Sequence, residues 1–226
     1  MLSLSVAGLG LLLLAWVWWR EQGRVARIRG ELLADCLGLL ERPVLVRDGL
    51  DYPVLRGRFA GCGAEIRPLA DSAALRKLPA LWLQVTLTGA TGAPGVLDAL
   101  RRPLGTEYWS PARDLPAGLP TPDELPADAE LRFDRQAALA LLPALQAQSG
   151  FLHRPEGKEV LITPKGVRLV VLLAEAERGS YLLFRDAQFA IRRLDPAYGR
   201  ELLDRAARLV ADVRSLAAGA GLDAAA

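Results

Sequence analysis

The sequence contains few of the residues that build metal sites. Its 226 residues include two cysteines, Cys36 and Cys62, and a single histidine, His153. Two thiols at that spacing form neither a disulfide framework nor a zinc site, and one imidazole adds no ligand cluster. We therefore expect no metal and no cofactor. Free, buried thiols fit a reducing cytoplasm, and a Cys36–Cys62 bridge is the alternative if the folded part lies outside it.

Motifs for covalent catalysis and phosphate binding are also missing. A nucleophile–base pair needs a histidine near Ser or Cys, but His153 precedes the turn-forming residues 154–157 and is expected to be an exposed loop residue. The chain has no P-loop, no nucleophile elbow and no dinucleotide-binding glycine pattern. These absences favour a protein that is not an enzyme.

Charge and aromatic content argue against a nucleic-acid partner. The chain has 28 Lys and Arg and 26 Asp and Glu; four arginines and one glutamate lie in residues 20–29, which leaves 24 basic and 25 acidic residues elsewhere. A nucleic-acid-binding domain usually has a basic surplus in its folded part. Aromatic residues that could stack on bases are sparse beyond the first 19 residues.

The most informative feature is an uncharged N-terminal run. Residues 2–19 consist of apolar and small residues and end in Trp16, Trp18 and Trp19. As a helix, 18 residues span roughly 27 Å, close to the thickness of a bilayer core, and indole rings favour the lipid–water boundary. The sequence therefore predicts a single transmembrane anchor in contact with the lipid bilayer. A cleaved signal peptide or a buried helix is the alternative, but no basic residue precedes the run and no Ala-x-Ala motif follows it.

The residues after this run predict the orientation. Arg20, Arg24, Arg27 and Arg29 follow it, with Glu21 as the only acid among them. Positive flanking charge is retained on the cytoplasmic side. The excess of Arg over Lys, which occurs only at positions 77, 158 and 165, and the abundance of Ala, Leu, Gly and Pro suggest a GC-rich bacterial gene. We therefore expect a single-pass protein of a bacterial inner membrane with its C-terminal domain in the cytoplasm. The residues expected at the membrane interface are Trp16, Trp18, Trp19, Arg20, Arg24 and Arg27.

Periodicity and turn residues divide the chain into four parts. We expect an anchor at 1–19, a juxtamembrane amphipathic helix at 20–41, a soluble α+β domain at 42–218 and a frayed tail at 219–226. Within the domain, residues 89–128 are rich in Pro and Gly and predict a long loop or a linker between two lobes, in which residues 96–100 and 107–109 could form short elements.

The predicted domain combines an antiparallel sheet with packed helices. Expected strands are 44–46, 52–59, 64–67, 81–87, 131–133, 159–163, 167–173 and 181–184. Expected helices are 71–75, 134–148 and 195–218, with N-caps at Asp71, Asp134 and Asp195.

Two sets of residues are candidates for binding. A basic patch toward anionic headgroups could be formed by Arg76, Lys77, Arg101 and Arg102, although solvated surface charge is the simpler interpretation. Tyr108 and Trp109 lie in the Pro-rich segment and could contact a partner. Trp82, in contrast, is expected in the core.

Carboxylates are the only candidates for catalysis. Asp71, Asp98 and Glu107 lie near the irregular region and could act with nearby arginines on a lipid-linked or membrane-proximal substrate. A solvated or capping role is the alternative for each of them.

Two segments carry a resemblance to other proteins. Residues 71–83 and 158–169 are similar to uncharacterised membrane-anchored proteins of proteobacteria, and the resemblance extends over much of residues 43–215. It implies a membrane location and supplies neither an activity nor site residues.

Three functions are consistent with these features. The favoured one is a non-enzymatic module at the inner membrane that binds a protein partner or the membrane surface. An enzyme acting through the carboxylates is the second. A subunit that is stable only within a larger complex is the third, and it would expose a large apolar patch.

Overall fold

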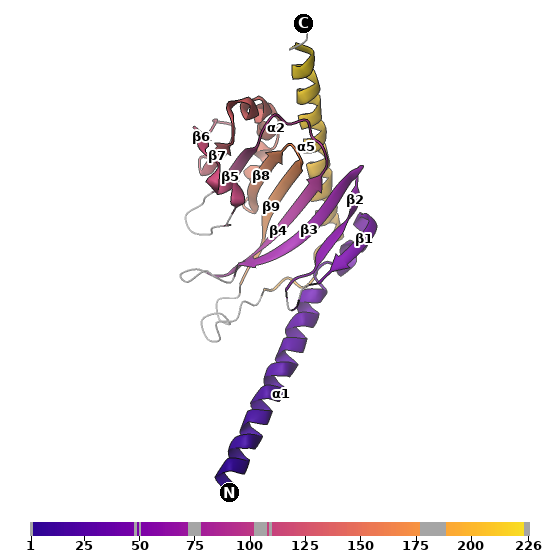
Figure 1. The fold of residues 1–226 in the computed structure, drawn as a ribbon, viewed down its shortest axis with the longest axis vertical. Helices are drawn as coiled ribbons and strands as arrows, with labels where there is room; N and C mark the ends of the chain where they lie inside the picture. The colour runs from indigo at the N-terminus through magenta and orange to yellow at the C-terminus, as the bar shows by residue number, and fades with distance from the viewer. Residues whose placement is uncertain are drawn as a thin grey trace.

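The computed structural model contains one sheet and several helices (Figure 1). The structure describes the backbone of residues 2–223 except residues 48, 50, 72–77, 102–107, 109 and 177–188. Side chains are described for residues 12–219, with the same exceptions and also without residues 21, 22 and 111. The helical elements are α1 (Leu2–Gly30), η1 (Ala34–Leu39), η2 (Pro111–Asp114), η3 (Gln136–Leu141), α2 (Leu142–Gln146), α3 (Ser149–Leu152) and α5 (Pro196–Asp223), where η denotes a 3-10 helix. The α+β prediction is confirmed.

Nine strands form the sheet, and every pairing between them is antiparallel. The strands are β1 (Glu41–Val46), β2 (Val54–Phe59), β3 (Cys62–Asp71), β4 (Ala80–Thr88), β5 (Leu97–Arg101), β6 (Ala117–Leu119), β7 (Ala129–Phe133), β8 (Gly157–Thr163) and β9 (Gly166–Glu175). Their spatial order is β1-β2-β3-β4-β9-β8-β5-β7-β6. The sheet therefore joins strands from both halves of the chain.

The centre of one face of the sheet, at β4 and β9, is covered by α5, which lies behind it in Figure 1. The short helical elements η1, α3 and η3 contact β1, β8, and β5 and β7. Alternate strand residues point to this face and contact the apolar stripe of the helix. Leu83 and Val85 of β4 and Leu209 of α5 are fully buried in this cluster. Asp195 caps the helix, because its Oδ1 accepts a hydrogen bond of 2.8 Å from the Ala197 N–H, as predicted.

The first helix projects away from the sheet, and its end is fixed to the domain (Figure 1). Arg47 donates a 3.1 Å hydrogen bond to the Gly30 carbonyl, and the Arg29 guanidinium lies 5.4 Å from the Tyr52 ring centre. Beyond the helix, Leu33 and Cys36 are buried under α5, and the Leu194 N–H donates to the Leu32 carbonyl at 2.8 Å. Within the part of the chain that the structure describes, no helix has a segment long and apolar enough to cross a membrane.

Two predicted helices differ from the structure. The helix expected at 20–41 ends at Gly30 and is followed by a turn and η1, because the Leu32 carbonyl is bound by Leu194 rather than by the next helical turn. The helix expected at 134–148 is instead η3, α2 and a separate α3. Asp134 does not cap it, since its Oδ1 accepts from the Val96 N–H at 2.8 Å.

The strand predictions are mostly confirmed within the part of the chain that the structure describes. The expected hairpin of 159–163 and 167–173 is formed by β8 and β9. Asp71 is the last residue of β3, which pairs with β4 as far as Asp71↔Ala80. This extended position is compatible with the predicted N-cap, because a capping residue has non-helical φ and ψ. The helix expected after Asp71 and the strand expected at 181–184 lie outside the described residues.

The Pro/Gly-rich segment 89–128 contributes to the sheet. It contains β5, which is buried between β8 and β7, and the short strand β6. At the other end of the chain, α5 continues through the tail glycines to Asp223 rather than ending at 219.

Gly166 provides a test of this packing. Its φ is +150°, and a Cβ at this position would lie 2.1 Å from the Leu87 carbonyl oxygen of β4. We expect Gly166→Ala to lower the free energy of unfolding by more than about 1 kcal/mol, because the new methyl group would push β4 and β9 apart.

Gly150→Ala is the matched control, since nothing lies within 4 Å of its missing Cβ in the helix α3. It should be neutral or stabilising by up to about 1 kcal/mol. Thermal or denaturant unfolding of the full chain measures both, and equal effects would contradict the described β4–β9 contact.

Candidate functional site

The face of the sheet opposite α5 carries charged and polar side chains. Residues that pair directly across antiparallel strands share a face, and one such row crosses seven strands. From β2 to β7 the row consists of Arg56, Glu65, Thr86, Arg168, Leu161, Asp98 and Arg132. We call this surface the open face.

A buried ion pair lies at its centre. Arg168 of β9 donates to both carboxylate oxygens of Glu159 on β8, at 2.7 and 3.1 Å, and one Nη also contacts the Ser110 hydroxyl at 3.3 Å. Glu159 is fully buried, and Arg168 is 17% exposed. Burial alone would lower the pKa of Arg168, but the Glu159 carboxylate beside it raises the pKa above its usual range.

Aromatic residues pack beside this pair. Tyr108 lies edge-on to the Trp82 ring with centres 5.8 Å apart, and Gln84 Nε2 donates to the Tyr108 hydroxyl. The Lys158 ammonium is 5.6 Å from the Trp82 ring centre. Burial, followed by the charge of Glu159, raises the pKa of Tyr108 to about 12, so the phenol is protonated at neutral pH.

A second charged group lies on β2 and β3. Glu65 accepts from Arg56 at 2.7 Å and from Arg67 at 2.8 Å. Partial burial would raise the pKa of Glu65, but the hydrogen bonds from Arg67 and Arg56 hold it below its usual value. One carboxylate is thus shared by two guanidinium groups, which leaves this part of the open face positively charged.

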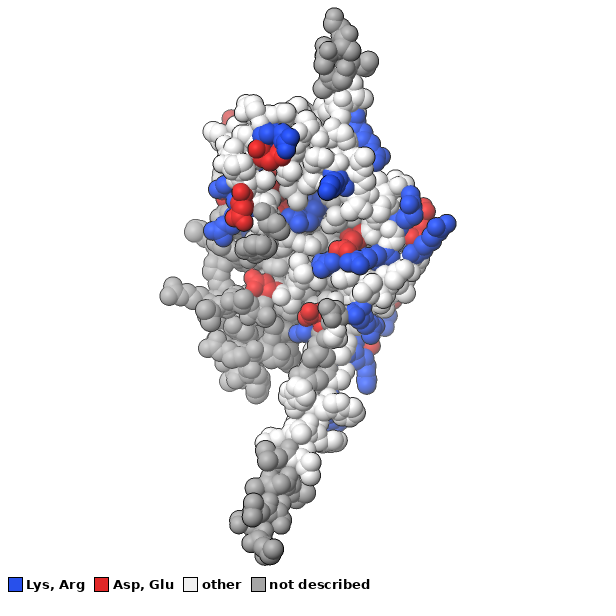
Figure 2. Space-filling model, in the orientation of Figure 1, with Lys and Arg blue, Asp and Glu red and all other residues white. Residues whose placement is uncertain are grey.

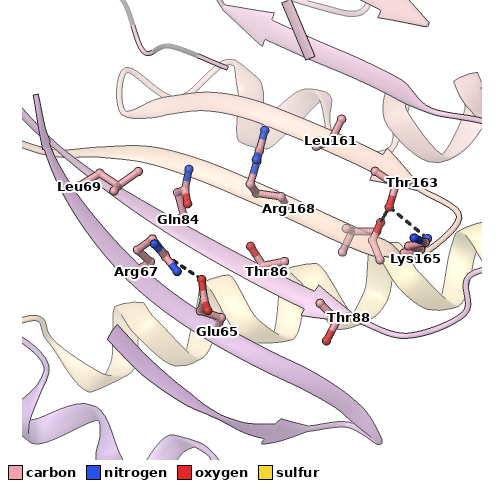
Figure 3. Close-up of a pocket in the computed structure, with 12 residues that line it drawn as sticks. Glu65, Arg67, Leu69, Gln84, Thr86, Thr88, Leu161, Thr163, Lys165 and Arg168 are labelled. Atoms are coloured by element: carbon pink, nitrogen blue, oxygen red, sulfur yellow. Dashed lines mark hydrogen bonds and ion pairs between the residues drawn. The ribbon is translucent and has the colours of Figure 1, made fainter. Parts of the chain in front are cut away.

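Between these two groups the surface is hollowed (Figure 3). The hollow has a volume of about 370 Å³. The described side chains along it include the cations Arg67, Lys165 and Arg168, the carboxylate Glu65 and apolar and hydroxyl groups from β3, β4, β8 and β9. Figure 2 shows Lys and Arg side chains beside Asp and Glu side chains on this side of the molecule.

Arg101 is engaged in structural contacts. Its guanidinium makes two hydrogen bonds to Asp128, at 3.0 and 2.9 Å, and donates to the Arg154 carbonyl at 2.8 Å. The hydrogen bond from Arg101 holds the pKa of Asp128 below its usual value. Its predicted partners in a basic patch, Arg76, Lys77 and Arg102, lie outside the described residues.

The predicted aromatic contact pair is described only in part. Tyr108 is 6% exposed and packs against Trp82, so the structure places it under the surface of the open face. Trp109 lies outside the described residues. Trp82 is buried, as predicted.

The carboxylates considered for catalysis are not brought together. Asp71 is on β3 and Asp98 on β5, with β4, β9 and β8 between them. Four strand spacings correspond to roughly 19 Å, whereas a carboxylate acid–base pair works at about 5–9.5 Å. Glu107 lies outside the described residues. Asp71 and Asp98 therefore form no catalytic pair.

The thiols and the histidine are placed as predicted. Cys36 and Cys62 are free and buried. Burial, followed by the charges of Asp35 and Asp195, raises the pKa of Cys36 to about 11, which makes this thiol a poor nucleophile. His153 is exposed, with Nδ1 2.9 Å from the Ser149 carbonyl. Among the described residues, no three His, Cys, Asp or Glu side chains are arranged to hold a metal ion.

The predicted membrane-interface residues all lie on α1. Trp16, Trp18 and Trp19 are 53–71% exposed, and the Arg20 guanidinium is 5.5 Å from the Trp16 ring centre. Arg24 and Arg27 follow on exposed positions of the same helix.

Sequence reasoning missed the residues at the centre of the open face. Glu159, Arg168 and Gln84 interrupt apolar strands at alternate positions, and that period-2 pattern could have assigned them to a common face. The sequence does not give the register that brings Glu159 and Arg168 into contact.

Comparisons of this chain with protein-family models and with curated proteins find no match. The resemblance to membrane-anchored proteins of proteobacteria therefore stays a prediction.

The buried ion pair of Glu159 and Arg168 leads to a prediction about stability. Glu159→Gln leaves the Arg168 guanidinium without its counter-charge in a buried position, so we expect roughly 3–5 kcal/mol loss in the free energy of unfolding.

Asp204→Asn is the control, because the Arg200–Asp204 pair lies one helical turn apart on α5 and both side chains are exposed. It should change stability by less than about 0.5 kcal/mol. Denaturant unfolding of the two full-length variants measures both changes in the free energy of unfolding. A Glu159→Gln variant as stable as the unmodified chain would contradict the burial of the ion pair.

Proposed function

We propose that this chain is a membrane-anchored binding module of a bacterial inner membrane, in which α1 is embedded in the bilayer and the open face of the sheet receives a partner. The module itself is not an enzyme. The observation that carries the proposal is the contrast between an exposed apolar helix and a folded domain with little exposed apolar surface.

The helix α1 exposes far more apolar side chains than the domain does. Seven large apolar residues of α1, at 12–14 and 16–19, are 50–71% exposed. Among the described residues beyond α1, the exposed large hydrophobic side chains are Leu37, Val44 and Val46. A contiguous apolar surface favours a lipid or protein environment over water. The proposed span also needs residues 2–11, whose side chains lie outside the described part of the chain. Their sequence is uncharged, so together with residues 12–19 they extend the apolar run to the length of a span.

The flanking residues support a bilayer rather than a protein groove. Three tryptophans end the apolar run, and arginines follow within the next turns of the same helix. Indole rings favour the headgroup region, and arginines favour the cytoplasmic side. In this arrangement the N-terminus lies outside and the domain lies in the cytoplasm close to the membrane.

A binding role for the domain is supported by the open face. Its charged groups are held in place by neighbouring strands, and Asp71 and Asp98 are too far apart for acid–base catalysis. The partner is proposed to be a protein or a ligand with complementary polar groups. A subunit of a larger complex is supported less, because the described part of the domain shows little exposed apolar surface.

Vesicle flotation and carbonate extraction test the anchor. The full chain should float with vesicles and stay in the membrane pellet at alkaline pH. Leu12→Arg combined with Leu13→Arg should release it, because each arginine near the middle of a span costs roughly 2.5–3.5 kcal/mol. Both side chains are exposed, so the domain should fold normally.

Leu37→Arg is the matched control, since Leu37 is an exposed leucine of η1 on the domain. It should float like the unmodified chain. An unmodified chain that remains soluble without detergent, or equal release of the two variants, would contradict the anchor. Protease added to right-side-out vesicles should spare the domain, and its digestion would reverse the orientation.

A further inference from the structure

We propose that the hollow on the open face binds an oxyanion, a phosphate or carboxylate group, carried by a small soluble molecule. The inference rests on the proposed binding role of the domain and names its ligand class. A volume of about 370 Å³ lies within the range of small-molecule sites, roughly 300–1,000 Å³.

The cations of the hollow have N–H groups available for a ligand. Toward the described residues, Arg67 donates through its Nε alone, to Glu65, and Arg168 donates through its Nε and one Nη, to Glu159 and Ser110. Within the described part of the chain, the Lys165 ammonium makes no ion pair. Guanidinium groups match the geometry of phosphate and carboxylate oxygens, and an ammonium adds a point charge.

The charge balance of the hollow favours an anion. Its described lining has three cations and one carboxylate, Glu65. Among the neighbouring charges, Arg56 offsets Glu159 and Lys158 offsets Asp98, so the local charge stays at two positive. Thr86 contributes a hydroxyl group between the two guanidinium groups, since β4 lies between β3 and β9 (Figure 3).

The two arginines are held in place before a ligand arrives. Glu159 and Ser110 fix Arg168 from one side, and Glu65 fixes Arg67 from the other. Such preorganisation lowers the entropic cost of binding. Leu69, Leu161 and Val167 also line the hollow and would contact an apolar part of the same ligand.

The position of the hollow favours a soluble molecule over a lipid headgroup. Thr88, Thr163 and Lys165 line it, so it lies toward the end of β4 where Gly166 pairs with Thr88. Figure 1 shows this arrowhead end of β4 far along the long axis of the molecule from the N-terminal end of α1. A bilayer around α1 would therefore lie at a distance from the site.

Titration of the full chain in neutral detergent micelles with phenyl phosphate tests the site, because this probe combines a phosphate with an apolar ring. We expect saturable binding with a Kd of about 1 mM or below by calorimetry. Arg67→Gln and Lys165→Gln should each weaken binding at least about fivefold, since each removes a charge-assisted hydrogen bond.

Arg58→Gln is the matched control, because Arg58 is an arginine of β2 that does not line the hollow. It should bind like the unmodified chain. Absence of saturable binding up to about 10 mM, or equal weakening by all three variants, would overturn the proposal.

A second arm distinguishes the source of the anion. The titration is repeated in nanodiscs of phosphatidylcholine alone and with about one third phosphatidylglycerol. Equal affinity supports a soluble ligand, whereas loss of binding in the anionic nanodiscs assigns the site to lipid headgroups and overturns the proposal. The micelle titration does not depend on bilayer insertion, so failure of the anchor and failure of this site are distinguishable.

Discussion

The burial of one sheet face under α5 and the short helical elements beside it is the constraint on which the rest of the structure depends. A strand places alternate side chains on opposite faces, so sealing one face with apolar residues fixes the register of every strand that contributes to it. Val85, Leu209 and Val213 are completely buried in that layer. Polar residues at the intervening positions are then gathered on the other side, where the open face forms.

The carboxylates Glu159 and Glu65 on the open face are each paired with arginine. Fully buried Glu159 is matched by Arg168, and partly buried Glu65 is shared by two arginines. A buried carboxylate without such a partner would cost several kcal/mol, so these contacts stabilise the fold and orient the cations at the same time. The surplus of positive charge at the hollow follows from this geometry, and the proposed oxyanion site depends on it.

Local sequence signals predicted the elements that depend on local chemistry. The alternation in 81–87, the turn before Gly166 and the Asp195 cap all have short-range causes, and the structure contains them. The helices expected at 20–41 and 134–148 were wrong because long-range contacts override propensity. The Leu194 N–H donates a hydrogen bond to the Leu32 carbonyl, and the Val96 N–H donates one to the Asp134 carboxylate. The pairing of Glu159 with Arg168 was equally beyond prediction, because it depends on the register of β8 and β9. The short element expected at 96–100 is β5, but its surrounding proline and glycine gave no sign that it is an inner strand of the sheet.

Thiol labelling of adjacent positions on β4 tests the division between a sealed and an open face most directly. Thr86 lies on the open face and Val85 is fully buried against α5, while the native thiols Cys36 and Cys62 are buried. In the folded full-length chain, Thr86→Cys should react rapidly with a maleimide, and Val85→Cys should react only after denaturation. Equal labelling of the two positions in the folded state would contradict the account.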